Sequence, residues 1–332
     1  MTSPDLRHHG DVDAAPGLAD FAVNVRVPHP PDWLRERLAA ALDGLGRYPS
    51  HLAEVRAREA VARRHGRSPD EVLLLNGAAE GFALLPKLAP RRAAIVHPGF
   101  TEPEVAFRDA GIPVDHVLLD GDFALPEHVR TDADLIVIGN PTNPTSVLHE
   151  AARLRALPGR LVVDEAFMDA VPGEPESLAH DPDVLVLRSL TKTWGLAGLR
   201  AGYLLGDPET LARLAHGRPH WPVGSLTLEA ITACCEPEAL AQSAEFASAG
   251  QRYAAAAVEQ LQDLVVVAPN GPFLLIRAPR GTRQALRDKG IAVRRCDTFP
   301  GLDDTYLRVA IRPPEEFAVF VDALRVVMEE LA

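Results

Sequence analysis

Lysine is scarce in this chain of 332 residues, occurring three times among 34 basic side chains. The remaining 31 (34 minus 3) are arginines, whose guanidinium groups stay protonated at neutral pH and cannot act as nucleophiles. A lysine amine can lose its proton and form a Schiff base. Lys87 follows a proline and Lys289 precedes a glycine at an expected helix end, which are ordinary settings. Lys192 lies between two threonines, shortly after the apolar run 184–187, so it is the candidate for a lysine that forms a Schiff base.

Cysteine, long apolar runs and positive charge are scarce as well. The three cysteines, two of them adjacent, form neither a disulfide framework nor a zinc-binding spacing, so no metal site is expected. No apolar run approaches the roughly 20 residues of a membrane span, and residues 1–13 lack the layout of a signal peptide. The formal charge of −12 disfavours a general nucleic-acid partner. We therefore expect a cytoplasmic protein with no nucleic-acid or membrane partner.

Short apolar segments alternate with helical segments in the first two thirds of the chain. The expected strands are 72–75, 93–97, 135–139, 161–164, 184–187 and 201–205. Continuous apolar strands separated by helices indicate a mainly parallel sheet covered on both faces, that is, an α/β fold. A polar motif follows each of the first five, and ligands bind such sheets at the carboxyl ends of the strands. A binding site is therefore expected at that edge.

The remainder of the chain is expected to form a smaller α+β domain. Residues 226–264 read as a long helix with breaks near Pro237 and Gly250. Strand-like runs and a terminal helix follow, at 264–267, 273–276, 291–294, 306–311 and 314–331. The predicted organisation is an N-terminal segment, 1–31, that packs on the small domain, a large domain, 32–225, and a linker helix with the small domain, 226–332.

The spacing of Ser189 and Lys192 formally matches the serine–lysine pair of penicillin-binding enzymes. The Ser-Asp-Asn and Lys-Thr-Gly motifs that this chemistry requires are absent from the sequence. Pyridoxal phosphate is the alternative, because its aldehyde forms an imine with lysine and its ring acts as an electron sink. Asp164, at the end of an expected strand, would accept a hydrogen bond from the ring nitrogen and keep it protonated.

The same cofactor needs a phosphate cradle, a flat group against its ring and a donor to its phenolate oxygen. Small residues that open a helix after a strand expose backbone N–H groups to phosphate, and hydroxyls and a guanidinium complete such a cradle. The residues assigned to the cradle are Gly77, Ala78, Ala79, Ser189, Thr191 and Arg200. Phe100 would stack on the ring and Asn143 would donate to the phenolate oxygen.

Five segments carry a family resemblance: NGAAE, HPGF, NPTNPTS, VVDEAF and SLTKTWGLAGLR, which begin at residues 76, 97, 140, 162 and 189. Together and in this order they are similar to the signature of fold-type I pyridoxal-phosphate enzymes, the class I/II aminotransferases. Within that family they most resemble the branch of histidinol-phosphate aminotransferase and threonine-phosphate decarboxylase. The resemblance implies a homodimer in which Tyr48 reaches the neighbouring subunit's cofactor phosphate. It also implies that Asn24, His9, Arg294 and Arg308 bind the substrate, the arginines holding its anionic groups.

Particular residues bear on which of the two activities the resemblance implies. Phe167 stands where aminotransferases of the family more often carry a tyrosine, and His8-His9-Gly10 resembles an element at the start of the decarboxylases. Pro272 and Ser146 depart from the pattern of the branch on the substrate side. The first expectation is an enzyme like the L-threonine O-3-phosphate decarboxylase of cobalamin biosynthesis. The alternative is a histidinol-phosphate type of aminotransferase, and either would take a small phosphorylated amino acid or amine.

A catalytically idle cofactor-binding or regulatory protein on the same fold is the remaining alternative. A transcription factor of this kind would need a fused DNA-binding domain, for which the N-terminal segment leaves no room. The set of Lys192, Asp164 and Arg200 is intact, which favours an enzyme.

Overall fold

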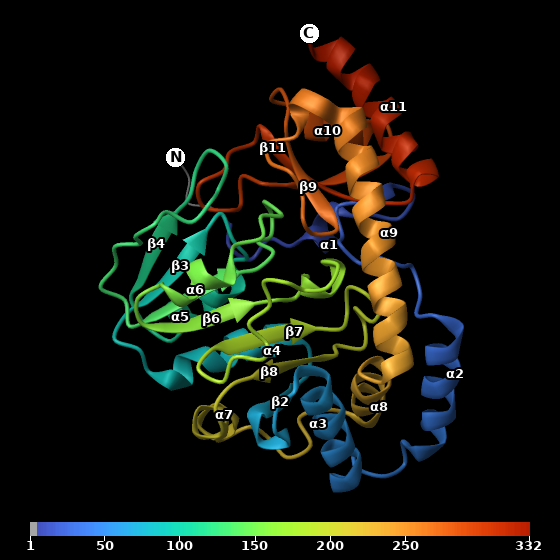
Figure 1. The fold of residues 1–332 in the computed structure, drawn as a ribbon. Helices are drawn as coiled ribbons and strands as arrows, with labels where there is room; N and C mark the ends of the chain where they lie inside the picture. The colour runs from blue at the N-terminus through green and yellow to red at the C-terminus, as the bar shows by residue number, and fades with distance from the viewer. Residues whose placement is uncertain (1–4) are drawn as a thin grey trace.

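The computed structural model describes residues 5–332, which form two sheets of unequal size (Figure 1). The larger sheet has seven strands in the order β2-β8-β7-β6-β5-β3-β4. Their bounds are β2 Val72–Leu75, β3 Ala93–His97, β4 Val114–Leu118, β5 Leu135–Gly139, β6 Arg160–Asp164, β7 Leu185–Ser189 and β8 Gly202–Leu205. β8 is antiparallel to β2 and β7, and the other pairs are parallel.

The expected α/β class with a mainly parallel sheet is confirmed, and the six expected strands lie within two residues of their predicted bounds. The sequence did not indicate β4. This strand lies at the edge of the sheet and none of its residues is fully buried, so Asp115 and His116 interrupt the apolar run that marks the other strands.

Both faces of the large sheet are covered. Along β3, Ala94 and Val96 join one apolar cluster while Ala93 and Ile95 join the other, as strand geometry requires. The first cluster includes residues of α2 Asp32–Ala41, α3 His51–His65, α6 Ala151–Arg155 and α8 Ser225–Cys234. The second includes residues of α4 Ala78–Leu84, α5 Glu102–Asp109 and α7 Pro208–Ala215. Polar groups can therefore collect at the strand ends.

The smaller sheet has the order β1-β10-β11-β9. Its strands are β1 Ala19–Phe21, β9 Phe273–Arg277, β10 Ile291–Arg295 and β11 Tyr306–Ala310. It packs with α10 Thr282–Asp288, α11 Pro314–Leu331 and the end of α9 Pro237–Leu261. β1 comes from the N-terminal segment and pairs in parallel with β10, so part of that segment is a strand of this sheet. The segment also contains a short helix, α1 Gly10–Asp13.

Helix α9 runs along one side of the molecule, from α8 beside the large sheet to α10 and α11 beside the small one (Figure 1). The break expected near Gly250 is wrong, because α9 continues through it. One helical glycine costs only about 1 kcal/mol, which the rest of this 25-residue helix can offset. The strand expected at 264–267 is also wrong, since that stretch contributes one isolated bridge, Val265 to Ile276.

Short 3-10 turns join several of these elements, at Leu42–Gly44, Pro69–Glu71, Leu85–Leu88, Met168–Ala170 and Gln262–Leu264. Within residues 5–332, no helix has the length and apolarity needed to cross a membrane.

Candidate active site

A cavity of about 560 Å³ lies at the carboxyl ends of β3, β5, β6 and β7 and is bordered by the N-terminal segment and the small sheet. This volume falls in the range of small-molecule sites. Most of the side chains assigned from the sequence line it: His9, Asn24, Ala78, Ala79, Phe100, Asn143, Asp164, Ser189, Thr191, Lys192, Arg200, Arg294 and Arg308. Two assigned residues do not line it. Gly77 lies behind Arg200, and Tyr48 lies on the outer surface.

Lys192 lies in the turn that follows β7. Burial, reinforced by the positive charges of Arg308 and Arg200, lowers the pKa of its amine to about 8. Its backbone carbonyl accepts a hydrogen bond of 2.9 Å from the N–H of Arg26, which fixes the turn. The amine therefore loses its proton more readily than an exposed lysine would, as a nucleophile requires.

Asp164 is the last residue of β6, and its carboxylate accepts a hydrogen bond of 3.0 Å from the N–H of Ala166. Burial raises the pKa of this carboxyl group to about 6, against the opposing effects of that hydrogen bond and of Lys192. The group is thus mostly ionised at neutral pH in a place that disfavours its charge. A cationic N–H donor in the cavity would relieve this cost.

The residues assigned to the phosphate cradle lie together at one end of the cavity. Gly77 precedes α4 with φ of +84°, and a Cβ at this position would lie 2.8 Å from Nη2 of Arg200. The guanidinium group therefore lies directly against backbone that only glycine can provide. The hydroxyls of Ser189 and Thr191 are 2.8 Å apart, and together with Arg200 they supply donors suited to a phosphate.

Three further side chains have contacts that suit a flat ligand above Lys192. The ring of Phe100 lies 5.6 Å from that of His9 and 5.7 Å from that of Phe82. Asn143 accepts a hydrogen bond of 2.7 Å from Arg308, which leaves its amide N–H groups for another acceptor. The amide of Asn24 is buried, and neither its nitrogen nor its oxygen has a hydrogen-bond partner among residues 5–332. An unsatisfied buried amide costs about 1–3 kcal/mol, which a ligand would remove.

Arg294 and Arg308 lie opposite each other on β10 and β11, but their surroundings differ. Arg294 donates to the carbonyls of His8 and Arg295, each at 2.7 Å, and to the hydroxyl of Thr298 at 2.9 Å. Arg308 bonds only Asn143 and the carbonyl of Ala22 among residues 5–332. Burial, and then the charge of Arg294, lowers the pKa of Arg308 to about 9, so it is still a cation at neutral pH. Arg308 is therefore the freer of the two for binding an anion.

Two acidic residues of the cavity have no sequence pattern that could have revealed them. Asp11 of α1 lines it and faces Lys192 closely enough to affect the pKa of the amine. Glu102 of α5 also lines it and accepts a hydrogen bond of 2.6 Å from His9. The position of Asp11 depends on how the N-terminal segment folds over the cavity, whereas Glu102 is the first residue of α5. The cavity thus has both cationic and acidic groups in its lining.

A buried ionic network behind the site also went unpredicted. Arg188 of β7 contacts Glu165 at 2.9 Å, Glu174 at 2.8 Å and Asp169, and Arg64 contacts Asp169 at 2.9 Å. The arginine that directly follows the apolar run 184–187, inside a buried strand, was the available signal. The network joins the loop after Asp164 to the strand that ends at Ser189, so it holds both in place.

Tyr48 is 75% exposed and stacks on Trp221, with ring centroids 4.2 Å apart. It does not contact the cavity of its own chain. A role toward a second subunit is compatible with this position and stays a prediction.

The residues around Lys192 fit pyridoxal phosphate, as the close approach of Arg200 to Gly77, the unpartnered amide of Asn24 and the donor set of the cradle show. When bound, this cofactor supplies an electron sink. Lys192 would hold its aldehyde and afterwards carry a proton to or from the substrate. Asp164 would keep the ring nitrogen protonated, and Phe100 would limit access of water to the ring face.

Comparison with known proteins identifies the family. The sequence profile of aminotransferase class I and II matches residues 20–324. A histidinol-phosphate aminotransferase of Mycobacterium tuberculosis is 58% identical over 335 residues, covering 97% of this chain and 92% of that one. The threonine-phosphate decarboxylase of Salmonella typhimurium is 33% identical over 342 residues, covering 95% and 92%. Among solved structures, histidinol-phosphate aminotransferase from Clostridium acetobutylicum superposes with a TM-score of 0.83 at 22% identity, covering 94% of this chain and 99% of that one.

The fold and the site thus define a pyridoxal-phosphate-dependent enzyme of fold type I. The chain belongs to the class I and II aminotransferase family.

Proposed function

We propose that the protein is an aminotransferase of the histidinol-phosphate type. The observation that carries this proposal is the 58% identity, over nearly the whole chain, to a relative of that name. The decarboxylase expected first from the sequence has the weaker support, because the relative of that name is 33% identical.

The charges around the cavity support the same substrate. Arg308 offers a cation for a phosphate, and Asp11 and Glu102 are acidic groups that also line the cavity. Histidinol phosphate carries a phosphate at one end and an imidazole with an N–H group at the other. Threonine phosphate carries two anionic groups and has no imidazole to pair with Asp11. Opposite charges attract and like charges repel strongly where water is excluded.

Decarboxylation of L-threonine O-3-phosphate is the second candidate, because of Phe167. Its ring centroid lies 5.9 Å from the amine of Lys192 and it has no hydroxyl to offer the cofactor, as the resemblance to decarboxylases led us to expect. The two reactions differ in which bond at the substrate Cα stands perpendicular to the cofactor ring. A carboxylate held upright leaves as CO₂, whereas a substrate without a carboxylate, such as histidinol phosphate, can lose only a proton.

The proposal extends to the roles of the residues and to assembly. Lys192 is the catalytic residue, with Asp164, Asn143 and the cradle holding the cofactor. Arg308 binds the substrate phosphate, with Asn24, His9 and Arg294 completing the substrate site. The protein is proposed to work in the cytoplasm as a homodimer in which Tyr48 reaches the second subunit.

The deciding experiment incubates the cofactor-loaded protein with each substrate separately and follows the products by NMR. Histidinol phosphate with 2-oxoglutarate should give glutamate over many turnovers, and the Lys192→Ala variant should give none. L-Threonine O-3-phosphate without a keto acid should give no more than one equivalent of product. Repeated release of CO₂ and aminopropanol phosphate, without glutamate formation in the first reaction, would overturn the proposal in favour of the decarboxylase.

A further inference from the structure

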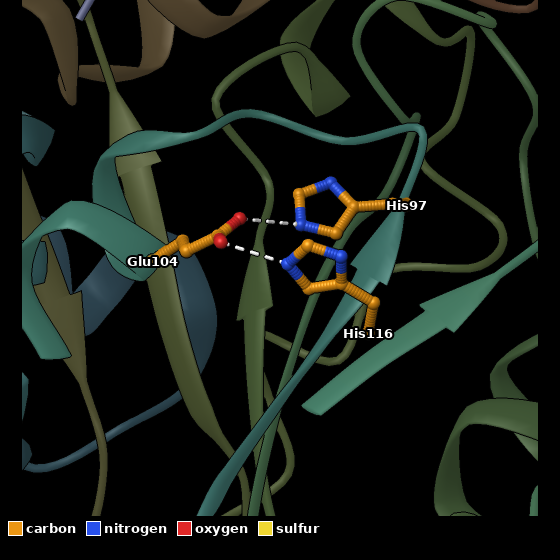
Figure 2. A group of neighbouring side chains, drawn as sticks. All are labelled: His97, Glu104 and His116. Carbon is orange, nitrogen blue, oxygen red and sulfur yellow. Dashed lines mark hydrogen bonds and ion pairs between the residues drawn. The ribbon is translucent and has the colours of Figure 1, made fainter. Parts of the chain in front are cut away.

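Three side chains outside the cavity point toward one another between the edge strands β3 and β4 of the large sheet and helix α5. Figure 2 shows the imidazole rings of His97 and His116 turned toward the carboxylate of Glu104. Nε2 of His97 lies 3.0 Å from one carboxylate oxygen and Nε2 of His116 lies 2.7 Å from the other. One potential ligand atom from each residue lies within 4.8 Å of the other two.

The fold places these residues together although they are distant in sequence. His97 ends β3 and His116 lies in β4, which is parallel to it. His97 pairs with Leu118, two residues beyond His116, so both histidines project from the same face of the sheet. Glu104 lies in the first turn of α5, which covers that face. Two strands and one helix thus each contribute one donor.

We propose that His97, Glu104 and His116 bind a divalent transition-metal ion, with zinc the expected occupant. Two imidazole nitrogens and one carboxylate oxygen form a donor set that zinc binds, with the fourth position left for water. Bonds of about 2.0–2.1 Å in tetrahedral geometry place the donor atoms about 3.3 Å apart. Nε2 of His97 and Nε2 of His116 approach different oxygens of Glu104, at 3.0 and 2.7 Å, so binding would require the side chains to turn until one oxygen and both nitrogens reach that spacing.

The burial of the cluster suits a bound ion that water can still reach. The side chains of His97 and Glu104 are fully buried, whereas that of His116 is 30% exposed and marks the open side. A metal-free cluster is balanced by Arg108, whose Nη2 lies 2.5 Å from Glu104. Arg108 is 54% exposed and is one helical turn from Glu104, so it can withdraw into solvent when an ion takes its place.

The site would be structural, because none of its three side chains lines the cavity. His97 precedes the Pro98-Gly99-Phe100 turn, and α5 also carries Glu102, which holds His9. A bound ion would join β3, β4 and α5 next to the turn that carries Phe100. Its expected effect is to stabilise the wall on which the cofactor ring rests.

The test measures metal bound to the cofactor-loaded protein, first stripped with EDTA and then freed of excess cofactor, which itself binds metals. After dialysis against zinc, we expect one ion per chain by elemental analysis. His116→Ala and Glu104→Gln should lower zinc affinity by more than about tenfold, because losing even an outer partner of a metal ligand typically costs about 10- to 100-fold. His128→Ala is the matched control, because His128 is exposed on a loop, and it should bind as the wild type does.

A second readout separates the site from adventitious binding to the chain's 12 histidines. Cobalt in place of zinc should give visible bands of a four-coordinate ion in the wild type and in His128→Ala, but not in His116→Ala. Saturating zinc should raise Tm by several degrees in the wild type and not in His116→Ala. Wild type without stoichiometric zinc, or equal binding by His116→Ala, would show a purely hydrogen-bonded cluster and overturn the proposal.

Discussion

The two ionisable residues that the cofactor needs most, Lys192 and Asp164, have pKa values shifted in opposite directions by the same cause. Burial disfavours charge, so it lowers the pKa of the amine to about 8 and raises that of the carboxyl group to about 6. The cofactor-free site is therefore electrostatically costly. Binding pyridoxal phosphate would remove the cost, because the lysine becomes linked to the aldehyde and the carboxylate gains a ring N–H.

The first prediction concerns Asp164→Asn in the cofactor-free protein. The folded-state pKa of Asp164 is raised from 3.8 to about 6, so its contribution to stability is present below pH 3.8 and is lost as the pH rises through 6. The loss amounts to at most about 3 kcal/mol for a shift of roughly two units. Asparagine does not ionise, so the variant should gain stability relative to wild type between pH 4 and pH 7.

Urea unfolding of both proteins across this pH range measures the difference. The catalytic activity of the cofactor-loaded proteins should differ in the opposite direction. Asp164→Asn should be much less active than the wild type, since asparagine cannot hold the ring nitrogen protonated. If the unfolding free energies of the two proteins differed by the same amount at every pH from 4 to 7, ionisation of Asp164 would not destabilise the folded protein.

The second prediction concerns substrate choice and Asp11. If Asp11 attracts the imidazole of histidinol phosphate, Asp11→Asn should raise KM for that substrate about tenfold, the order of one charge-assisted hydrogen bond. The same variant should bind threonine phosphate better than wild type does, because a like charge is removed. Steady-state kinetics and competition by threonine phosphate measure both effects. Asp5→Asn, an exposed position outside the cavity, is the control and should change neither.

At the scale of elements, what the sequence could predict depended on how local the signal was. The buried strands β2, β3 and β5 are continuous apolar runs, and their bounds were predicted without error. The edge strand β4 contains polar residues, and it is defined by its pairing with β3, which no local sequence pattern reveals. A short apolar run at 264–267 looked like a strand but found only one bridging partner.

The same distinction holds for the site. Lys192, Asp164 and the cradle were identified because each follows a strand within a short motif, and the sheet then brings those strand ends together. Asp11 was not identified, because its place depends on how the N-terminal segment crosses the cavity. The cluster of His97, Glu104 and His116 was missed for a related reason, since the donors come from two strands and a helix with no characteristic spacing.

The third prediction concerns the element that supports the strand ends, the buried network around Arg188. Arg188→Met would leave Glu165 and Asp169 as buried carboxylates with fewer partners, which typically costs about 3–5 kcal/mol. We expect a loss of that size in urea unfolding and weaker cofactor binding. Arg153→Met is the control, because its ion pair with Glu150 is largely exposed and should contribute less than about 1 kcal/mol. Equal stability of the two variants would contradict a supporting role for the network.

At the scale of the whole molecule, one surface has the character of an interface. Several large apolar side chains that are each more than half exposed lie in α3, in the segment before it, or against Tyr48 of that segment. They are Leu42, Leu45, Tyr48, Leu52 and Trp221. Apolar side chains clustered on a surface mark contact sites more often than isolated ones do. Tyr48 belongs to this group, and the family resemblance gives that residue a role toward a second subunit. We therefore infer that the same surface joins the two subunits of the proposed homodimer.

The fourth prediction tests this inference by placing charged side chains on the proposed interface. Leu45→Glu combined with Leu52→Glu should convert a dimer into monomers in size-exclusion chromatography with light scattering, because burying unpaired carboxylates is costly. Val319→Glu is the control, since Val319 is 52% exposed on α11, far along the chain from this surface, and should leave the dimer intact.

Tyr48→Phe should remain dimeric but bind pyridoxal phosphate about 10- to 100-fold more weakly, the effect of losing one hydrogen bond to a charged group. Unchanged cofactor affinity in a dimeric Tyr48→Phe would remove Tyr48 from the site while leaving the interface in place, so the two roles can be judged separately.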